Sequence, residues 1–194
     1  MNGRSLSEHT WNLLIGLSGH AENGKDTTAQ MATELLKQQH PDWRITTVGF
    51  AEAVKNRARE QGWNGEKDEA GRSLLQRIGT EGRNIYPNYW IDQLLRDRIK
   101  IGVDPEVRSV WFITDMRYLN EAIAVRTAKG LLWRIIRINP DGSPFMNRLT
   151  PEQRLHPSET DLDNFDDWDA VIVSASLGLK RRLIRQTLWE AHLL

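Results

Sequence analysis

Two glycines, a lysine and a hydroxyl group are spaced near the start of the chain as a phosphate-binding loop requires. Residues 13–27 read Leu-Leu-Ile-Gly-Leu-Ser-Gly-His-Ala-Glu-Asn-Gly-Lys-Asp-Thr, so an apolar run leads into Gly19 and then into Gly24. A loop that wraps a polyphosphate turns its backbone N–H groups inward, and it needs glycine wherever a side chain would block that turn. The spacing therefore predicts a nucleotide phosphate site. The alternative is a glycine-rich turn in another kind of α/β protein.

Each residue of this loop has an expected role. Lys25, which we expect to be exposed, would bridge the outer phosphates, and a helix beginning near Gly24 would direct its unpaired N–H groups at the anion. The usual pattern has Ser or Thr directly after Lys, but Asp26 intervenes here, so Thr27 as metal ligand stays open. The residues expected to bind ATP are Gly19, Asn23, Gly24, Lys25, Asp26 and Thr27.

Composition limits the partners. The chain has 194 residues, 26 basic and 26 acidic side chains, and no cysteine. Zero net charge argues against direct nucleic-acid binding, and the absence of thiols removes disulfides and zinc-thiolate sites. No run resembles a signal peptide or a membrane span, so we expect no membrane contact and a cytoplasmic location. We predict a flexible extension over 1–11 and one domain over 12–194.

Short apolar runs alternate with helical periodicity, which is typical of a β-α-β fold. The expected strands are 12–17, 44–50, 109–114, 131–138 and 170–174. The expected helices are 24–40, 51–61, 71–80, 88–101, 117–129 and 177–190. This pattern predicts an α/β fold with a mainly parallel five-stranded sheet, covered on both faces, that binds ligands at the carboxyl ends of its strands. Trp43, Trp111 and Trp133 are expected in the core.

The periodicity disappears at about 140–168, and so long a connection is typical of a lid over a site. Arg148 and Arg154 could swing over the site and supply positive charge, although a surface loop with incidental arginines is equally compatible. His156 and Glu159 are interpreted as structural, with Ser158 as the cap of a short helix.

Two further groups of residues could bind phosphate-bearing ligands. Asp115 and Arg117 follow the third apolar run, where a carboxylate can hold Mg²⁺ through water and an arginine can grip a phosphate. The alternative is an Asp115 that caps helix 117–129 and an Arg117 paired with Glu121. The segment 72–90 combines Gln76, Arg77 and Trp90, which could read and stack on a base and neutralise a monophosphate, or could be an ordinary amphipathic helix with Trp90 in the core.

Several separated segments together resemble the phage-type deoxynucleoside monophosphate kinases, a branch of the P-loop nucleoside monophosphate kinases. Members of that superfamily commonly place one residue between Lys and Thr, as Gly-Lys-Asp-Thr does here. The matching segments are 19–27, 50–55, 74–81, 89–90, 114–121 and 156–159.

The resemblance implies a three-layer P-loop NTPase sandwich with a lid, and transfer of the γ-phosphate of ATP to a deoxynucleoside monophosphate with Mg²⁺. It implies catalytic roles for Lys25, Arg117, Arg148 and Arg154, and Mg²⁺ ligation by Thr27 and Asp115. The residues implied to bind the acceptor are Lys55, Gln76, Trp90, Asp115 and Arg117, and Arg77 is added to this set from the composition of segment 72–90. A homodimer is an option. A P-loop kinase of a small-molecule alcohol, with Asp115 as base, and a nucleotide-binding protein without turnover are the alternatives.

Overall fold

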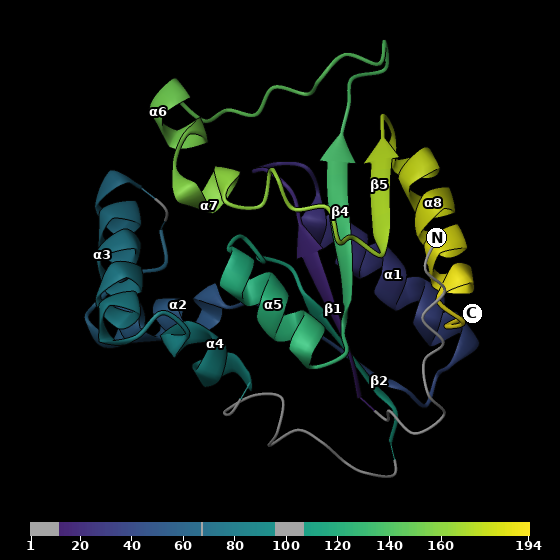
Figure 1. Cartoon of the computed structure of the whole chain (residues 1–194), viewed down its shortest axis with the longest axis horizontal. Helices are drawn as coiled ribbons and strands as arrows, with labels where there is room; N and C mark the ends of the chain where they lie inside the picture. The colour runs from purple at the N-terminus through teal and green to yellow at the C-terminus, as the bar shows by residue number, and fades with distance from the viewer. Residues whose placement is uncertain (1–11, 67, 96–106) are drawn as a thin grey trace. The chain divides into compact units, whose positions relative to one another are not determined.

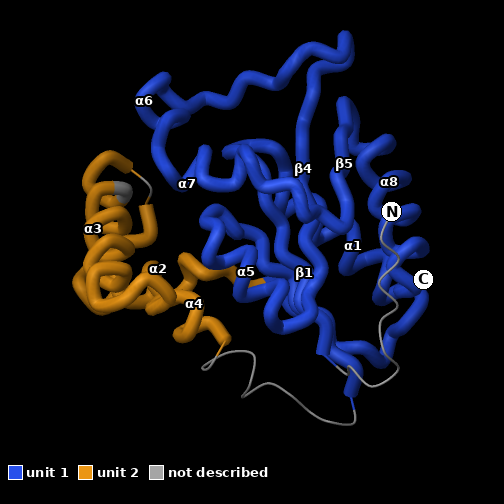
Figure 2. Tube along the Cα trace, viewed as in Figure 1, with its two compact units in different colours: residues 1–47, 104–194 blue, residues 48–103 orange. Residues whose placement is uncertain are grey.

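The computed structural model describes residues 12–66, 68–95 and 107–194 (Figure 1). The chain divides into two compact units, Met1–Thr47 with Asp104–Leu194 and, separately, Val48–Val103 (Figure 2). The extension expected over 1–11 lies outside the described residues. The single domain expected over 12–194 stays a prediction. Among the described residues, no helix is both long enough and apolar enough to span a bilayer.

The larger unit contains a five-stranded sheet with β1 at its centre. The strand order is β2-β3-β1-β4-β5, and β1 pairs in parallel with β3 and with β4, as β4 does with β5. The prediction of an α/β fold with a mainly parallel five-stranded sheet is confirmed. The strands are β1 (Asn12–Ser18), β2 (Arg44–Val48), β3 (Ser109–Ile113), β4 (Leu131–Arg137) and β5 (Ala170–Ser174).

Helices cover both faces of this sheet. α1 (Lys25–Gln39) and α8 (Leu177–Glu190) pack against each other on one face, and α5 (Leu119–Thr127) packs on β1 and β4 from the other (Figure 1). Because both faces are covered, the central strands are continuous apolar runs. The three tryptophans expected in the core, Trp43, Trp111 and Trp133, are all buried.

The loop after β1 lies where the strand order reverses. The chain passes from β1 through α1 to β2 at one edge and returns by β3, and it then crosses β1 to form β4 and β5 on the other side. In open parallel sheets such a switch point, at the carboxyl ends of the strands, is where ligands bind.

The smaller unit is helical. It contains α2 (Ala51–Glu60), α3 (Glu69–Ile85) and α4 (Tyr89–Leu94), which pack on one another around Val54, Ala58, Ile78 and Trp90. α3 begins earlier than the expected residue 71 because the Asp68 carboxylate caps it by accepting from the Gly71 N–H at 2.7 Å. α4 is the first part of the helix expected over 88–101, and most of the remainder lies outside the described residues.

The excursion between β4 and β5 contains two one-turn helices, α6 (Pro151–Arg154) and α7 (Pro157–Thr160). The prediction of Ser158 as cap is wrong. His156 is the N-cap of α7, and its Nδ1 atom accepts from the Ser158 N–H at 3.1 Å, because proline occupies the first helical position and fixes the turn one residue earlier.

Candidate phosphate-binding site

The loop between β1 and α1 depends on its two glycines. Gly19 has φ +151°, and a Cβ atom there would lie 2.3 Å from the Ile135 carbonyl oxygen of β4. Gly24 is the N-cap of α1 in the left-handed region, with φ +84°. Both positions therefore exclude ordinary side chains, one through a backbone contact and the other through conformation. The chain turns tightly from the end of β1 to the N-terminus of α1.

Lys25 is the first residue of α1, and its ammonium group lies against the loop. Its Nζ donates to the Gly19 carbonyl oxygen at 2.6 Å and to the His20 carbonyl oxygen at 3.1 Å. The expectation of an exposed lysine is wrong, because Lys25 is only 8% exposed. Burial, followed by the positive charge of Arg117, lowers its pKa from 10.5 to about 8. Carboxylates nearby oppose this shift.

The far side of the loop is held by Lys180, a residue that the sequence analysis missed. Its Nζ reaches from α8 to the Asn23 carbonyl oxygen at 2.9 Å, and its side chain is buried. Burial is the main cause that lowers the pKa of this second lysine. A signal was present in the sequence, because Lys180 shares the buried stripe of α8 with Ile184 and Leu188, where a lysine needs a specific partner.

Asp115 and Arg117 follow β3 and belong to the surroundings of Lys25, since both act on its charge. The guanidinium of Arg117 forms an ion pair with Glu159 and donates to the Ser158 carbonyl oxygen at 3.1 Å. The alternative that paired Arg117 with Glu121 through their side chains is wrong. The Glu121 carboxylate instead accepts from the backbone N–H groups of Arg117 at 2.7 Å and of Tyr118 at 3.1 Å, at the N-terminus of α5.

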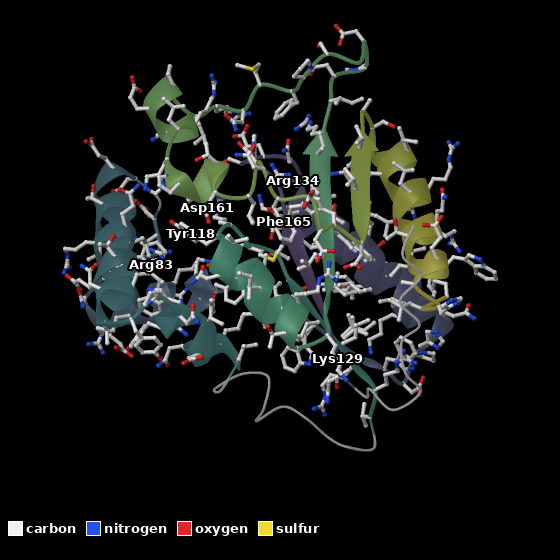
Figure 3. The ribbon with its side chains drawn as sticks, viewed as in Figure 1. Arg83, Tyr118, Lys129, Arg134, Asp161 and Phe165 are labelled. Atoms are coloured by element: carbon white, nitrogen blue, oxygen red, sulfur yellow. The ribbon has the colours of Figure 1, made fainter. Side chains whose placement is uncertain are left out.

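The excursion reaches the loop through its acidic residues. The Glu159 carboxylate accepts from the Ala21 N–H at 2.8 Å. Asp161 accepts from the Leu119 N–H at 2.7 Å, and Figure 3 shows Asp161 next to Tyr118 at the N-terminal end of α5. Residues 159–161 therefore hydrogen-bond to the loop and to the N-terminus of α5. The composition of the segment did not predict these contacts.

The hydroxyl and carboxylate groups of the first turn of α1 have different surroundings. Asp26 is exposed and Thr27 half-buried, whereas Thr28 is buried and its hydroxyl donates to the Gly24 carbonyl oxygen at 2.9 Å. Thr28 is thus engaged by its own helix, and Thr27 is the threonine that faces outward. In the part of the chain that the structure describes, no three His, Asp or Glu side chains gather as a metal site.

The two arginines expected to act from the excursion differ in their contacts. Arg148 is 92% exposed, and its Nε lies 3.8 Å from Glu22 Oε1 in the loop. Its backbone N–H also donates to Glu22 Oε2 at 3.3 Å. Arg154 is held within the excursion, because its Nε donates to the Asn147 side chain at 3.1 Å. Arg148 is therefore linked to the phosphate loop, and Arg154 is linked to its own segment.

The acceptor residues expected in the smaller unit come from three helices and differ in exposure. Gln76 and Arg77 are exposed on α3, and Arg77 pairs with Glu81 at 2.7 Å. Lys55 on α2 lies 3.7 Å from Glu52. Trp90 is buried, and its indole N–H donates to the Gly79 carbonyl oxygen at 2.9 Å.

A cavity of about 280 Å³ lies between α2 and α4. Trp90 contributes to its wall, so among the four expected residues of this unit it alone is part of this cavity. Aromatic, amide and charged side chains share the lining, which combines an apolar surface with hydrogen-bonding groups. The lining residues are Gly49, Glu52, Ala53, Asn56, Arg57, Glu60, Tyr89, Trp90, Gln93 and Leu94.

No protein-family model matches the chain, and neither does any curated protein. Solved structures that are similar include a shikimate kinase from Aquifex aeolicus, with 14% identity, a TM-score of 0.45, and coverage of 93% of this chain and 96% of that one. A protein designated APE1195 has 13% identity, a TM-score of 0.40 and the same coverage. Such scores are too low to support a function, which has to be inferred from the site itself.

Proposed function

We propose that this protein is an ATP-dependent kinase that transfers the γ-phosphoryl group of ATP to a deoxynucleoside monophosphate, giving ADP and the diphosphate. The observation that carries the proposal is the loop of residues 19–25. Gly19 and Gly24 adopt conformations that only glycine accepts readily, and Lys25 is held against the loop at the N-terminus of a 15-residue helix. This combination suits a polyphosphate better than any uncharged ligand.

The contacts of Lys25 leave it able to bind phosphate. An ammonium group has three N–H donors, and in the described part of the chain two of them serve the carbonyl oxygens of Gly19 and His20. The remaining donor and the charge would act on the oxygens around the moving phosphoryl group, where phosphoryl transfer needs stabilisation most. Because the acceptor phosphate is already an oxyanion, no general base is needed.

Mg²⁺ is proposed as the metal that accompanies ATP. The half-buried Thr27 hydroxyl and the Asp115 carboxylate are oxygen donors of the kind Mg²⁺ prefers, and Asp115 lies within electrostatic reach of Lys25. With only two such side chains proposed, phosphate oxygens and water would supply the remaining ligands. When bound, the metal would neutralise charge on the phosphates during transfer.

For the acceptor, we propose that Arg117 binds the monophosphate, since its guanidinium is only 30% exposed and already binds an anionic group. Arg148 is proposed to add charge from the excursion, because it is linked to Glu22 of the loop. Lys55, Gln76, Arg77 and Trp90 stay proposed acceptor contacts, and the cavity beside Trp90 supports that residue best.

An alcohol acceptor is the second candidate, and a specific observation favours it. The charge of the Asp115 carboxylate acts on Lys25, where it weakly opposes the lowering of that lysine's pKa. A carboxylate at this place could take the proton of an attacking hydroxyl, as phosphoryl transfer to an alcohol requires.

A coupled assay of ADP release tests the proposal with two panels of acceptors, one of ribo- and deoxynucleoside monophosphates and one of small alcohols. Turnover with a deoxynucleoside monophosphate, lost in Lys25→Met, is expected, and Lys37→Met near the far end of α1 is the matched control. Turnover with alcohols alone would replace the proposal by the second candidate. Calorimetric binding of ATP with no turnover of either panel would indicate a nucleotide-binding protein.

A further inference from the structure

Glu159 has a well-buried carboxylate at the phosphate loop, although it comes from a largely exposed segment. Its side chain is 8% exposed, whereas His156 and Pro157 beside it are exposed. One carboxylate oxygen accepts from the Ala21 N–H at 2.8 Å, and the other pairs with the Arg117 guanidinium. The carboxylate therefore bridges Ala21 in the loop and Arg117 in the connection between β3 and α5.

The groups that Glu159 contacts are donors that would also suit a phosphate. A backbone N–H of a phosphate loop and a guanidinium can only donate, and both favour a negatively charged acceptor. The Lys25 ammonium adds a positive charge within electrostatic reach of the same carboxylate. A carboxylate and a phosphate group present similar oxygens to these donors, so both would compete for the same contacts.

Neighbouring acidic residues hold Glu159 in this place. Asp161 accepts from the Leu119 N–H at 2.7 Å. Asp163 binds Arg134 at 2.7 Å and His20 at 2.8 Å. Three acidic residues at alternate positions thus fasten one segment to the loop, to α5 and to β4. The contact of Glu159 is part of this fastening.

We propose that Glu159 is an internal competitor for phosphate, which sets the affinity of the site for nucleotides. A phosphate-bearing ligand takes over the Ala21 N–H and binds the Arg117 guanidinium, and the Glu159 carboxylate withdraws because both anions compete for the one Ala21 N–H and repel each other. Residues 156–163 then loosen from the loop as the ligand binds. The inference rests on the phosphate-loop part of the proposed function and does not depend on the identity of the acceptor.

The test is calorimetric titration of the whole chain with inorganic pyrophosphate. Glu159→Gln keeps the size of the side chain and removes its charge, so pyrophosphate should bind at least about tenfold more tightly than to the unaltered protein. Glu152→Gln is the matched control, since Glu152 is an exposed residue of the same excursion. This variant should bind pyrophosphate with the same affinity as the unaltered protein. Equal or weaker binding by Glu159→Gln would overturn the proposal, because it would make Glu159 a positioning residue for Arg117.

Hydrogen exchange on the unaltered protein gives a second test that needs no variant. Pyrophosphate should speed amide exchange in residues 156–163, and slower exchange there would overturn the proposal. If neither protein binds pyrophosphate, the internal competitor and the phosphate loop fail together. If pyrophosphate binds as expected while no acceptor is phosphorylated, the proposed function fails and the role of Glu159 stands.

Discussion

Replacing Lys25 with methionine should abolish a rise in stability at alkaline pH that this one buried ammonium group causes. The side chain is 8% exposed, and burial followed by the charge of Arg117 lowers its pKa from 10.5 to about 8. The folded protein therefore releases the Lys25 proton at a lower pH than the unfolded chain does. Such a difference makes the free energy of unfolding depend on pH.

The sign and the size follow from the two pKa values. Between about pH 8 and pH 10.5 the unfolded state binds one more proton at Lys25 than the folded state, so stability rises with pH across this window. At about 1.4 kcal/mol per pKa unit, the rise amounts to about 3 kcal/mol. Below pH 8 the full cost of burying the charge is present, so Lys25 weakens the fold at neutral pH.

Urea unfolding of both proteins from about pH 7 to about pH 10.5 measures this rise. Other titrating groups are common to both proteins, so subtracting the two pH profiles isolates Lys25. Methionine also leaves the carbonyl oxygens of Gly19 and His20 without their donor, but that cost shifts the whole profile and not its slope. A difference between the two rises below about 1 kcal/mol would refute the burial of this charge.

Three other substitutions test the surroundings of the loop. Gly19→Ala should lower the free energy of unfolding by about 2 kcal/mol more than Gly62→Ala. Both residues have positive φ, but of the two only Gly19 would bring the added Cβ against a carbonyl oxygen. Equal losses of stability in thermal unfolding would contradict the clash. Lys180→Met should weaken ATP binding roughly tenfold in calorimetry by releasing the Asn23 carbonyl, while the exposed Arg182→Met should leave it unchanged. Arg117→Lys should raise the KM for the acceptor several-fold by removing the planar fork, and an unchanged KM would exclude its proposed role.

The strands and the phosphate loop could be predicted because local residues decide them. The central strands are apolar runs because helices cover both faces of the sheet. The strands expected over 12–17 and 170–174 agree closely with β1 and β5. The loop is set by glycines whose own φ values exclude other residues. The boundaries of α3 and α7 were misjudged because the capping side chains of Asp68 and His156 compete with simple periodicity.

The surroundings of the loop could not be predicted in the same way. Glu159 is 138 positions from Ala21, and Lys180 is 157 positions from Asn23. No periodic pattern links residues so far apart, and a carboxylate in a polar segment is typical of exposed surface. Their roles depend on where the excursion and α8 return to the sheet.

The amino-acid sequence by itself determined the strands, the turn at Gly19 and Gly24, and the place of Lys25 at the start of a helix, because these depend on backbone conformation and on the periodicity of neighbouring residues. The tertiary structure alone decided that Lys25 is buried and that Glu159 bridges Ala21 and Arg117. Desolvation and hydrogen bonding depend on separation in space, and only the folded chain fixes that separation.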